Sequence, residues 1–285
     1  MDEGRHVGSV VSVISLTTDF GAADPWVGVM KSVVLGINPG ATLVDLTHDV
    51  APGDVAGAAF LFGTAYRYLP PGSVHVLVVD PGVGSARRAL VVDSGRELFV
   101  APDNGLLTYA LRDGGATLPQ GATPFAPGTV ALPPGWRVWE LANPRYWLHP
   151  VSRTFHGRDI FAPVAAHLSL GVPPQEMGPP VAEVVALAVP APRREPDGAL
   201  VGHVLHVDRF GNLLTNIPEA DVSPDAVVEV AGRRLRGLSS SYAEGAGLLA
   251  IIGSHGCLEI ALTNASAAAA LGVRRGAEVR VKSAG

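Results

Sequence analysis

The chain has 285 residues, a length that accommodates one large domain or two of ordinary size. Hydrophobic residues make up 47% of it and charged residues 16%, so a sizeable core and a sparsely charged surface are expected. The net charge of −5 comes without any basic run, which argues against a nucleic-acid partner.

Residues 1–16 open with acidic residues rather than the basic region of a signal peptide, and serines interrupt their apolar stretch. No apolar run approaches the roughly 20 residues that a membrane helix requires. The single cysteine, Cys257, excludes an internal disulfide framework and a multi-thiolate metal site. We therefore expect a cytoplasmic protein without a signal peptide or a membrane partner.

The first part of the chain alternates strands and helices. Apolar strands and helical periods follow one another over residues 13–20, 24–40, 41–50, 54–69 and 73–80. Asp24 is expected to cap the first helix, with Pro25 at its first position, and Asp54 to cap the second. Because the strands are continuous apolar runs joined by helices, this order predicts a parallel sheet covered on both faces.

The pattern then changes. Two apolar runs within residues 89–102 enclose a Ser-Gly turn and predict a β-hairpin, and residues 103–111 predict a short helix. Residues 113–135 are rich in proline and glycine, so a mobile surface loop is expected there. A helical period returns over residues 157–171 despite Pro163.

Residues 190–199 are proline-rich and charged and lack apolar periodicity, so they are expected to form a linker. After them come short strands, and one alanine-rich helix near residues 264–271. The predicted fold is of the α/β class, with an N-terminal α/β domain over residues 1–189 whose central sheet is mostly parallel. A smaller C-terminal all-β barrel domain is predicted over residues 200–285.

Two carboxylates are expected at one edge of the predicted sheet. Asp19 ends the first strand and Asp80 the third, and ligands bind at the carboxyl ends of strands in open α/β sheets. Arg87 follows a glycine-rich turn that can fold its guanidinium back onto Asp80 and keep that carboxylate ionised. A turn-forming aspartate and a structural ion pair are the alternatives. The turn is not a dinucleotide fingerprint, because Arg87 replaces the third glycine and a strand follows instead of a helix.

His156 directly precedes a predicted helix, and the glycine after it permits close approach of a ligand. An imidazole can accept or deliver a proton near neutral pH, although a structural histidine is the alternative. Together, Asp80, Arg87 and His156 would supply a carboxylate, its anchor and a proton acceptor, a set suited to activating water. No G-x-S-x-G motif indicates a serine nucleophile.

A metal site is the competing interpretation of these residues. His48, Asp49, Asp80, Asp103 and His156 are of the types that bind metals. No H-E-x-x-H spacing or clustered Cys/His pattern connects them, so no metal is expected.

The second predicted domain carries its own candidates. In the motif VDRFGN, Asp208 offers a carboxylate, Phe210 an aromatic face, and Asn212 an amide that can both donate to and accept from an adenine edge. Ser254 and Glu259 lie at another strand-turn-strand junction, in GSHGCLEIA. For the VDRFGN motif, the alternative is a structural bulge or turn with Phe210 in the core.

Several long motifs, taken together, closely resemble the S-adenosylmethionine (SAM) hydroxide adenosyltransferases, relatives of the halogenases that form 5′-fluoro- and 5′-chloro-adenosine. The motifs occupy residues 17–21, 78–88, 101–105, 143–168, 207–212 and 253–261. The resemblance spans nearly the whole chain, although residues 113–135 look longer and less typical of the family.

The resemblance implies a homotrimer whose active sites lie between the N-terminal domain of one subunit and the C-terminal domain of its neighbour. It also implies a reaction, in which SAM and water give adenosine and L-methionine with no metal or other cofactor. It implies that Asp80, Arg87 and His156 activate the water. The substrate-binding positions that it implies are Asp19 at the ribose hydroxyls, Phe210 and Asn212 at adenine, and Asp208, Ser254 and Glu259 at further substrate contacts.

Three other functions are weighed against this one. A halogenase would use the same pocket, but an anionic Asp80 would repel a halide, and the matching position in the halogenases is not acidic. A non-catalytic binder of adenosine or SAM would have no need of the set formed by Asp80, Arg87 and His156. A metal-dependent phosphohydrolase would lose its activity in a chelator.

Overall fold

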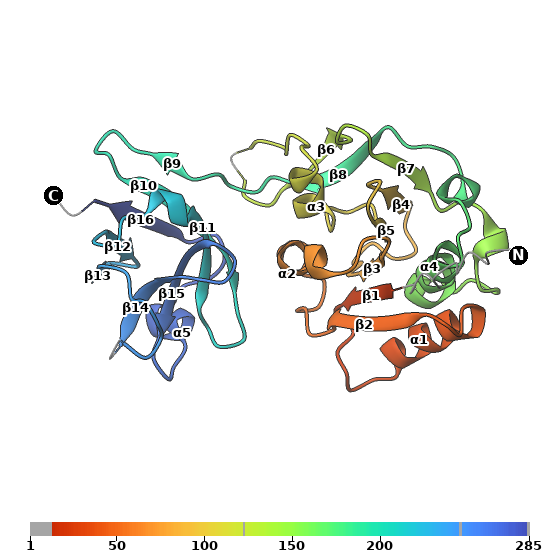
Figure 1. Ribbon diagram of the computed structural model, residues 1–285, viewed down its shortest axis with the longest axis horizontal. Helices are drawn as coiled ribbons and strands as arrows, with labels where there is room; N and C mark the ends of the chain where they lie inside the picture. Colours follow the sequence, from red (N-terminus) through yellow and green to blue (C-terminus); the bar gives the residue numbers. More distant parts are fainter. Residues whose placement is uncertain (1–12, 122, 245–246, 284–285) are drawn as a thin grey trace, which may run out of the picture. The chain divides into compact units, whose positions relative to one another are not determined.

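The computed structural model describes residues 13–121, 123–244 and 247–283 (Figure 1). The expectation about a signal peptide rests on residues that lie largely outside these ranges, so the structure does not bear on it. In the described ranges, every helix is too short or too polar to cross a membrane.

The described residues fall into two compact units. The first ends at Leu187 and the second begins at Ala188, except that Gln120–Ala126 belongs with the second. The boundary falls just before residues 190–199, the predicted linker.

The first unit is built on a mixed sheet with the strand order β2-β1-β3-β5-β4-β7. Its strands are β1 (Val13–Thr18), β2 (Thr42–Thr47), β3 (Val74–Val78), β4 (Ala89–Asp93), β5 (Leu98–Pro102) and β7 (Arg137–Glu140). The strand β1 pairs in parallel with β2 and β3, and β3 pairs in parallel with β5. The hairpin strand β4 runs antiparallel to β5 and β7. The predicted α/β class and the mostly parallel sheet are confirmed.

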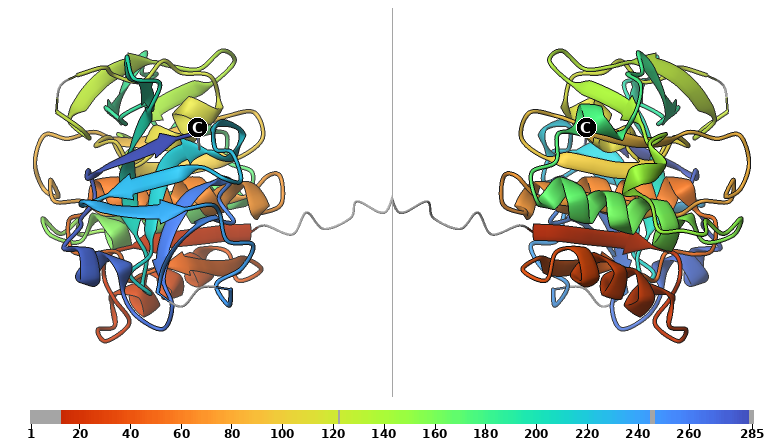
Figure 2. Two further views of the ribbon diagram at one scale, coloured as in Figure 1. Left: turned by 90° about the vertical axis from the view of Figure 1, so that its left-hand side faces the viewer. Right: turned by 90° about the vertical axis from the view of Figure 1, so that its right-hand side faces the viewer.

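Helices cover both faces of this sheet (Figure 2). They are α1 (Trp26–Ile37), α2 (Val55–Ala65), α3 (Thr108–Asp113) and α4 (Ala162–Ser169). The alternation of β3 divides its side chains between two cores, because successive residues point to opposite faces. Val76 packs in the core that α1 and α4 complete, and Leu77 in the core that α2 and α3 complete.

The first two helices begin differently. Asp54 caps α2 as predicted, since its side chain accepts a hydrogen bond of 2.9 Å from Gly57 N. The predicted cap of α1 by Asp24 is wrong by one residue. Pro25 is the N-cap, because its carbonyl accepts the first helical hydrogen bond, from Val29 N at 2.9 Å.

The predicted helix over residues 157–171 is confirmed, and the structure explains how it tolerates Pro163. A π-helical turn, Gly157–Phe161, precedes α4, and Pro163 lies in the first turn of α4. Proline has no N–H to donate to the carbonyl four residues earlier, that of Asp159. Leu148 N donates a hydrogen bond to this carbonyl instead, at 2.8 Å.

The mobile loop expected over residues 113–135 is wrong for part of that range. Strand β6 (Pro127–Ala131) pairs antiparallel with β8 (Glu183–Leu187) in a separate two-stranded sheet. The partner strand lies more than 50 residues away along the chain, so no local pattern indicates the pairing.

The second unit is an antiparallel sheet with the strand order β13-β12-β16-β10-β11-β15-β14. Its elements are β10 (Leu200–Val207), β11 (Leu213–Pro218), β12 (Val227–Val230), β13 (Arg233–Arg236), β14 (Leu248–Ile252), β15 (Cys257–Leu262), β16 (Glu278–Lys282) and α5 (Ala267–Leu271). Just after β13, Ser239 N donates to Ala250 O on β14 at 2.8 Å, which brings the two end strands together. The predicted all-β barrel is confirmed as a nearly closed sheet.

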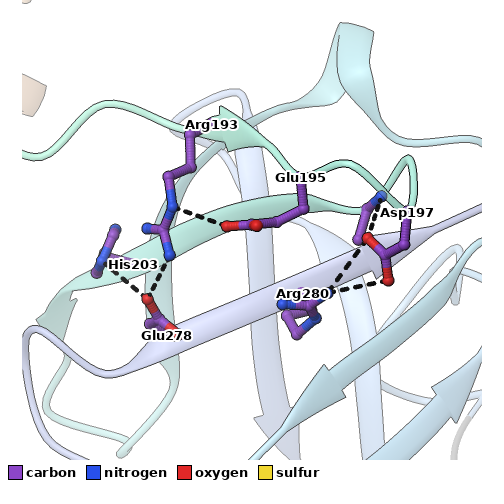
Figure 3. A network of polar contacts seen from close by, with 7 residues as sticks. Arg193, Glu195, Asp197, His203, Glu278 and Arg280 are labelled. Carbon is purple, nitrogen blue, oxygen red and sulfur yellow. Dashed lines mark hydrogen bonds and ion pairs between the residues drawn. The ribbon is translucent and has the colours of Figure 1, made fainter.

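The predicted linker folds onto this sheet. It contains the two-residue strand β9 (Arg193–Arg194), which pairs with β10. Arg193 contacts both Glu195 and Glu278 at 2.9 Å, and Arg280 contacts Asp197 at 3.2 Å (Figure 3). Exposed ion pairs are individually weak, but this group joins both ends of the segment to β16.

Buried His75, on β3, makes the stability of the first unit sensitive to acid. Its Nδ1 lies 2.7 Å from Ser15 Oγ, and burial together with Arg96 lowers its pKa to about 4. Between pH 6.5 and 4 the unfolded chain therefore binds a proton that the folded protein does not, so stability falls as the pH falls. We expect a loss of up to about 3 kcal/mol from this residue.

A His75→Leu variant tests this expectation. Its unfolding free energy, measured by chemical denaturation at several pH values, should fall less steeply than that of the wild type between pH 6.5 and 4. Parallel curves for the two proteins would contradict the assignment.

Candidate active site

The carboxyl ends of β1 and β3 place two of the predicted carboxylates at one edge of the first sheet. The strands are parallel neighbours, with Thr18 paired to Val78, so Asp19 and Asp80 follow at the same edge. Both line a cavity of about 460 Å³, and His156, from the turn before the π-helical segment, lines it as well. A cavity of this size is typical of small-molecule sites.

Arg87 holds Asp80 by a forked contact. Its Nε lies 3.0 and 2.9 Å from the two carboxylate oxygens, and its Nη2 contacts Oδ2. The side chain of Asp80 is 4% exposed and that of Arg87 is 11% exposed, so both charges are nearly buried and compensate each other. The geometry agrees with the prediction that Arg87 folds back onto Asp80.

A glycine lets this turn approach the segment that carries His156. Gly84 has φ +75°, and a Cβ at this position would lie 2.5 Å from Arg153 O. Another residue would therefore be strained and would also push the two segments apart.

His156 is hydrogen-bonded to the same guanidinium. Arg87 Nη2 lies 2.9 Å from His156 Nδ1, and because arginine only donates, Nδ1 must accept. The neutral ring therefore carries its proton on Nε2. Burial and the nearby Arg87 lower the pKa of His156, so the ring is neutral at pH 7.

Asp19 is held by a backbone amide. Its Oδ2 accepts a hydrogen bond of 2.8 Å from Gly53 N. Three aromatic side chains that the sequence analysis did not single out line the same cavity: Phe20, Trp26 and Phe155. The ring of Phe155 meets the other two edge to face, at centroid distances of 5.7 and 5.6 Å. In the sequence, Phe20 and Phe155 adjoin Asp19 and His156, and Trp26 lies two residues after Asp24.

The second unit brings together three of its predicted residues around a cavity of about 830 Å³. Asp208 Oδ1 accepts from the backbone N of Phe210 and Asn212, at 2.9 and 2.8 Å, which fixes the turn between β10 and β11. The ring of Phe210 is 78% exposed, so the alternative of a core phenylalanine is wrong. The amide of Asn212 is buried and contacts Asp208 Oδ2 at 3.2 Å.

Glu259 and Ser254 differ in their surroundings. Glu259 is buried on β15 and accepts a hydrogen bond of 2.6 Å from Tyr242 OH, which raises the pKa of Tyr242 to about 12. Burial raises the pKa of Glu259 itself. Tyr242 lines the 830 Å³ cavity and was missed in the sequence, where it is one aromatic residue in a polar loop. Ser254 is exposed in the turn between β14 and β15, outside the lining of that cavity.

The possible metal ligands have other partners. Asp103 contacts Arg88 Nη2 at 2.5 Å and accepts from Val185 N at 2.7 Å, so it joins β5 to β8. His48 Nδ1 lies 2.9 Å from Thr18 Oγ1. Over the part of the chain that the structure describes, no three His, Cys, Asp or Glu side chains are grouped as metal ligands.

Comparison with known proteins decides the family. The SAM hydroxide adenosyltransferase N-terminal domain matches residues 14–178, and the SAM hydroxide adenosyltransferase C-terminal domain matches residues 202–280. The chain belongs to the SAM hydroxide adenosyltransferase family. The resemblance expected from the sequence motifs is therefore confirmed.

Individual relatives of this adenosyltransferase-family chain fall into two groups. An (R)-S-adenosyl-L-methionine hydrolase of Thermus thermophilus is 43% identical, over 93% of this chain and 97% of the relative. A fluorinase of Actinoplanes is 28% identical, over 74% and 73%. A solved structure of an uncharacterized conserved protein from Thermotoga maritima aligns with a TM-score of 0.80 and 34% identity, covering 94% of this chain and 99% of that one.

A Gly84→Ala variant tests the geometry of the cluster. The added Cβ should separate the turn from the segment before His156 and weaken the contact with Arg87, so the lowered pKa of His156 should rise toward 6.5. An NMR titration of the imidazole measures this pKa.

Gly95→Ala is the matched control. Gly95 also has a positive φ, +81°, but nothing lies within 4 Å of its Cβ position. Both variants should lose stability, by roughly 1–2 kcal/mol from backbone strain, and only Gly84→Ala should shift His156. An unshifted pKa in Gly84→Ala would refute the proposed coupling.

Proposed function

We propose that this protein hydrolyses SAM to adenosine and L-methionine, by in-line attack of a water-derived oxygen on C5′. Membership of the family and the relatives named as (R)-SAM hydrolases support the reaction. The observation that carries it here is the buried Asp80 carboxylate, held by Arg87 at the wall of the cavity. Because the relatives are named for the (R) epimer at sulfur, we expect the same preference.

The chemistry requires little beyond a positioned nucleophile. An oxygen–C5′ bond forms while the C5′–sulfur bond breaks, and its electron pair remains on sulfur. The leaving group is the neutral thioether of methionine, so it needs no general acid. What limits the rate is the delivery of a desolvated oxygen in line with the breaking bond.

Asp80 is suited to that delivery. Arg87 occupies one side of its carboxylate, and the remaining lone pairs can accept a hydrogen bond from a water in the cavity. Because the carboxylate is nearly buried, its hydrogen bond to the water is stronger than it would be in solvent. The guanidinium of Arg87 favours the negative charge that develops on the water oxygen. We assign Asp80 as the group that orients the water and takes its proton.

His156 then has a different role from the proton acceptor predicted from the sequence. Its Nδ1 already accepts from Arg87, and Nε2 carries the proton of the neutral ring. To accept a second proton, the ring would have to give up its bond to the guanidinium. We assign His156 as the residue that keeps Arg87 aligned with Asp80.

Recognition of the nucleoside is assigned to both units. In the first, Asp19 would bind the ribose hydroxyls. In the second, the exposed ring of Phe210 offers a stacking face, and the buried amide of Asn212 offers a donor and an acceptor for adenine. Asp208 and Glu259 would fix these groups, and Ser254 would contact the substrate directly.

We further propose a homotrimer in which each site combines the first unit of one subunit with the second unit of its neighbour. The exposed Phe210 is consistent with a residue that completes a site elsewhere. A cytoplasmic location, expected from the single cysteine, stays a prediction.

Incubation with SAM, followed by chromatography, tests the reaction against its alternatives. Adenosine and methionine should appear in equal amounts, with or without a chelator, and label from ¹⁸O water should enter the adenosine. A product of 5′-chloro-adenosine in chloride would indicate a halogenase, and loss of activity in a chelator would indicate a metal-dependent enzyme. Binding without turnover would indicate a non-catalytic protein.

The role of Asp80 is tested by Asp80→Asn. The amide keeps the shape of the side chain but cannot take a proton, so turnover should fall by roughly 10²-fold or more while SAM still binds. Asp103→Asn is the control, because Asp103 is equally buried against an arginine but lies outside the cavity lining. It should lower stability and leave kcat nearly unchanged. Near-normal turnover in Asp80→Asn would contradict the assignment of Asp80 as the residue that takes the proton from water.

The shared site is tested by complementation. Asp80→Asn and Asn212→Ala subunits, each inactive or weak alone, should regain activity when they are coexpressed, because a mixed trimer forms some sites with both residues intact. Light scattering measures the mass of the assembly. A trimer that shows no rescue would indicate a site within one subunit.

A further inference from the structure

A chain of polar side chains adjoins the segment that carries Asp19, outside the lining of its cavity. It runs from Lys31 on α1, through Asp45 on β2 and His48 just after it, to Thr18 at the end of β1. The proposed mechanism uses none of these residues. His48 is the member that contacts the segment around Asp19 at two points.

The first contact runs through Thr18, which is completely buried. Its Oγ1 accepts a hydrogen bond of 3.3 Å from Phe20 N, and it lies 2.9 Å from His48 Nδ1. A hydroxyl can donate its proton to Nδ1 while it accepts from the backbone, and the Asp45 carboxylate beside Nε2 favours the ring proton on that nitrogen. His48 thereby fixes the hydroxyl that holds the residue following Asp19.

The second contact is through the backbone. Gly21 N donates to His48 O at 2.8 Å. The residue before Asp19 and the second residue after it are therefore both attached to His48. The carboxylate of Asp19, which itself accepts from Gly53 N, is presented from a segment held on both sides.

The outer part of the chain orients the imidazole. His48 Nε2 lies 2.9 Å from Asp45 Oδ1, in an electrostatic contact rather than a hydrogen bond, and Asp45 Oδ2 lies 2.5 Å from Lys31 Nζ. With Nδ1 accepting from Thr18, the ring proton belongs on Nε2, next to the carboxylate. Because the imidazole contacts Thr18 on one side and Asp45 on the other, its orientation is restricted, which suits it to supporting a binding group that must be placed accurately.

We propose that His48 is a positioning residue that sets the affinity of the site for the ribose diol, by holding Asp19 in its binding position. This inference rests on the proposed function, in which Asp19 binds the ribose hydroxyls. The His48 imidazole lies outside the cavity lining and acts through Thr18, whereas its backbone carbonyl holds Gly21 whatever the side chain.

Calorimetric titration with adenosine and with 2′,3′-dideoxyadenosine tests the inference without any turnover. His48→Ala should weaken adenosine binding about 10-fold, the effect of losing roughly one charge-assisted hydrogen bond. Binding of the dideoxynucleoside, which has no hydroxyls for Asp19 to hold, should stay within twofold of the wild type. A purely structural role would weaken both ligands equally.

His203→Ala is the matched control. The side chain of His203 is 12% exposed, as that of His48 is, and it also contacts a carboxylate, Glu278 at 3.9 Å, but it lies in the second unit. This variant should bind both nucleosides as the wild type does.

Two further variants keep the inference testable if His48→Ala folds poorly. His48→Asn places an amide oxygen near the position of Nδ1, so it should recover most of the adenosine affinity. Thr18→Val removes the hydroxyl, and combined with His48→Ala it should weaken adenosine binding no further than either change alone.

The outcomes separate this inference from the proposed function. If the wild type binds neither nucleoside, the assignment of a nucleoside site fails, and the proposed function fails with it. If the wild type binds adenosine more tightly than the dideoxynucleoside and the His48 variants keep that ratio, the positioning role of His48 is overturned.

Discussion

The nearly buried ion pair between Asp80 and Arg87 is the interaction on which the candidate site depends. A carboxylate that is 4% exposed stays charged only if a partner compensates for its lost hydration, and the forked guanidinium does so from one side. The opposite side is left for a ligand. Because the same guanidinium also reaches His156, a single residue aligns this carboxylate with a second segment that lines the cavity. Gly84 makes this possible by allowing two backbones to approach where a Cβ could not fit.

The parallel pairing of β1 and β3 supplies the second constraint. It brings Asp19 and Asp80 to one sheet edge from segments some 60 residues apart, on strands buried between two helical layers. The site residues follow the strands on turns, yet each turn is held by neighbours: Asp80 by Arg87, and the segment around Asp19 by Gly53 and His48. A rigid sheet with braced turns is a scaffold suited to in-line displacement, in which small misplacements of the nucleophile are costly.

The two units differ in what they offer a ligand. The first presents charged groups suited to a nucleophilic water and a diol. The second presents an exposed ring at Phe210, a buried amide at Asn212 and a tyrosine–glutamate pair. Neither set alone would serve both the chemistry and the recognition of a nucleoside sulfonium, which is why the proposed reaction and the proposed shared site stand together. Asp80 also separates the hydrolase from a halogenase, since a fixed negative charge at that wall disfavours a halide.

Much of this protein follows from local patterns. Apolar runs, turn residues and capping residues are read over a few positions, and they suffice to predict the alternation of strands and helices, the cap at Asp54 and the placement of Asp19 and Asp80 at strand ends. The contacts that give these residues their roles are not local. Arg87 meets His156 across 69 positions, Thr18 meets His48 across 30, and β6 finds its partner in β8. Tyr242, an ordinary residue in a polar loop, gains its role only by meeting Glu259. The Asp80–Arg87 pair spans only seven positions, so the sequence could predict it. Periodicity records which side of an element is buried, whereas the neighbour across that surface depends on how the whole chain packs, and for that reason the distant polar partners came from the folded structure.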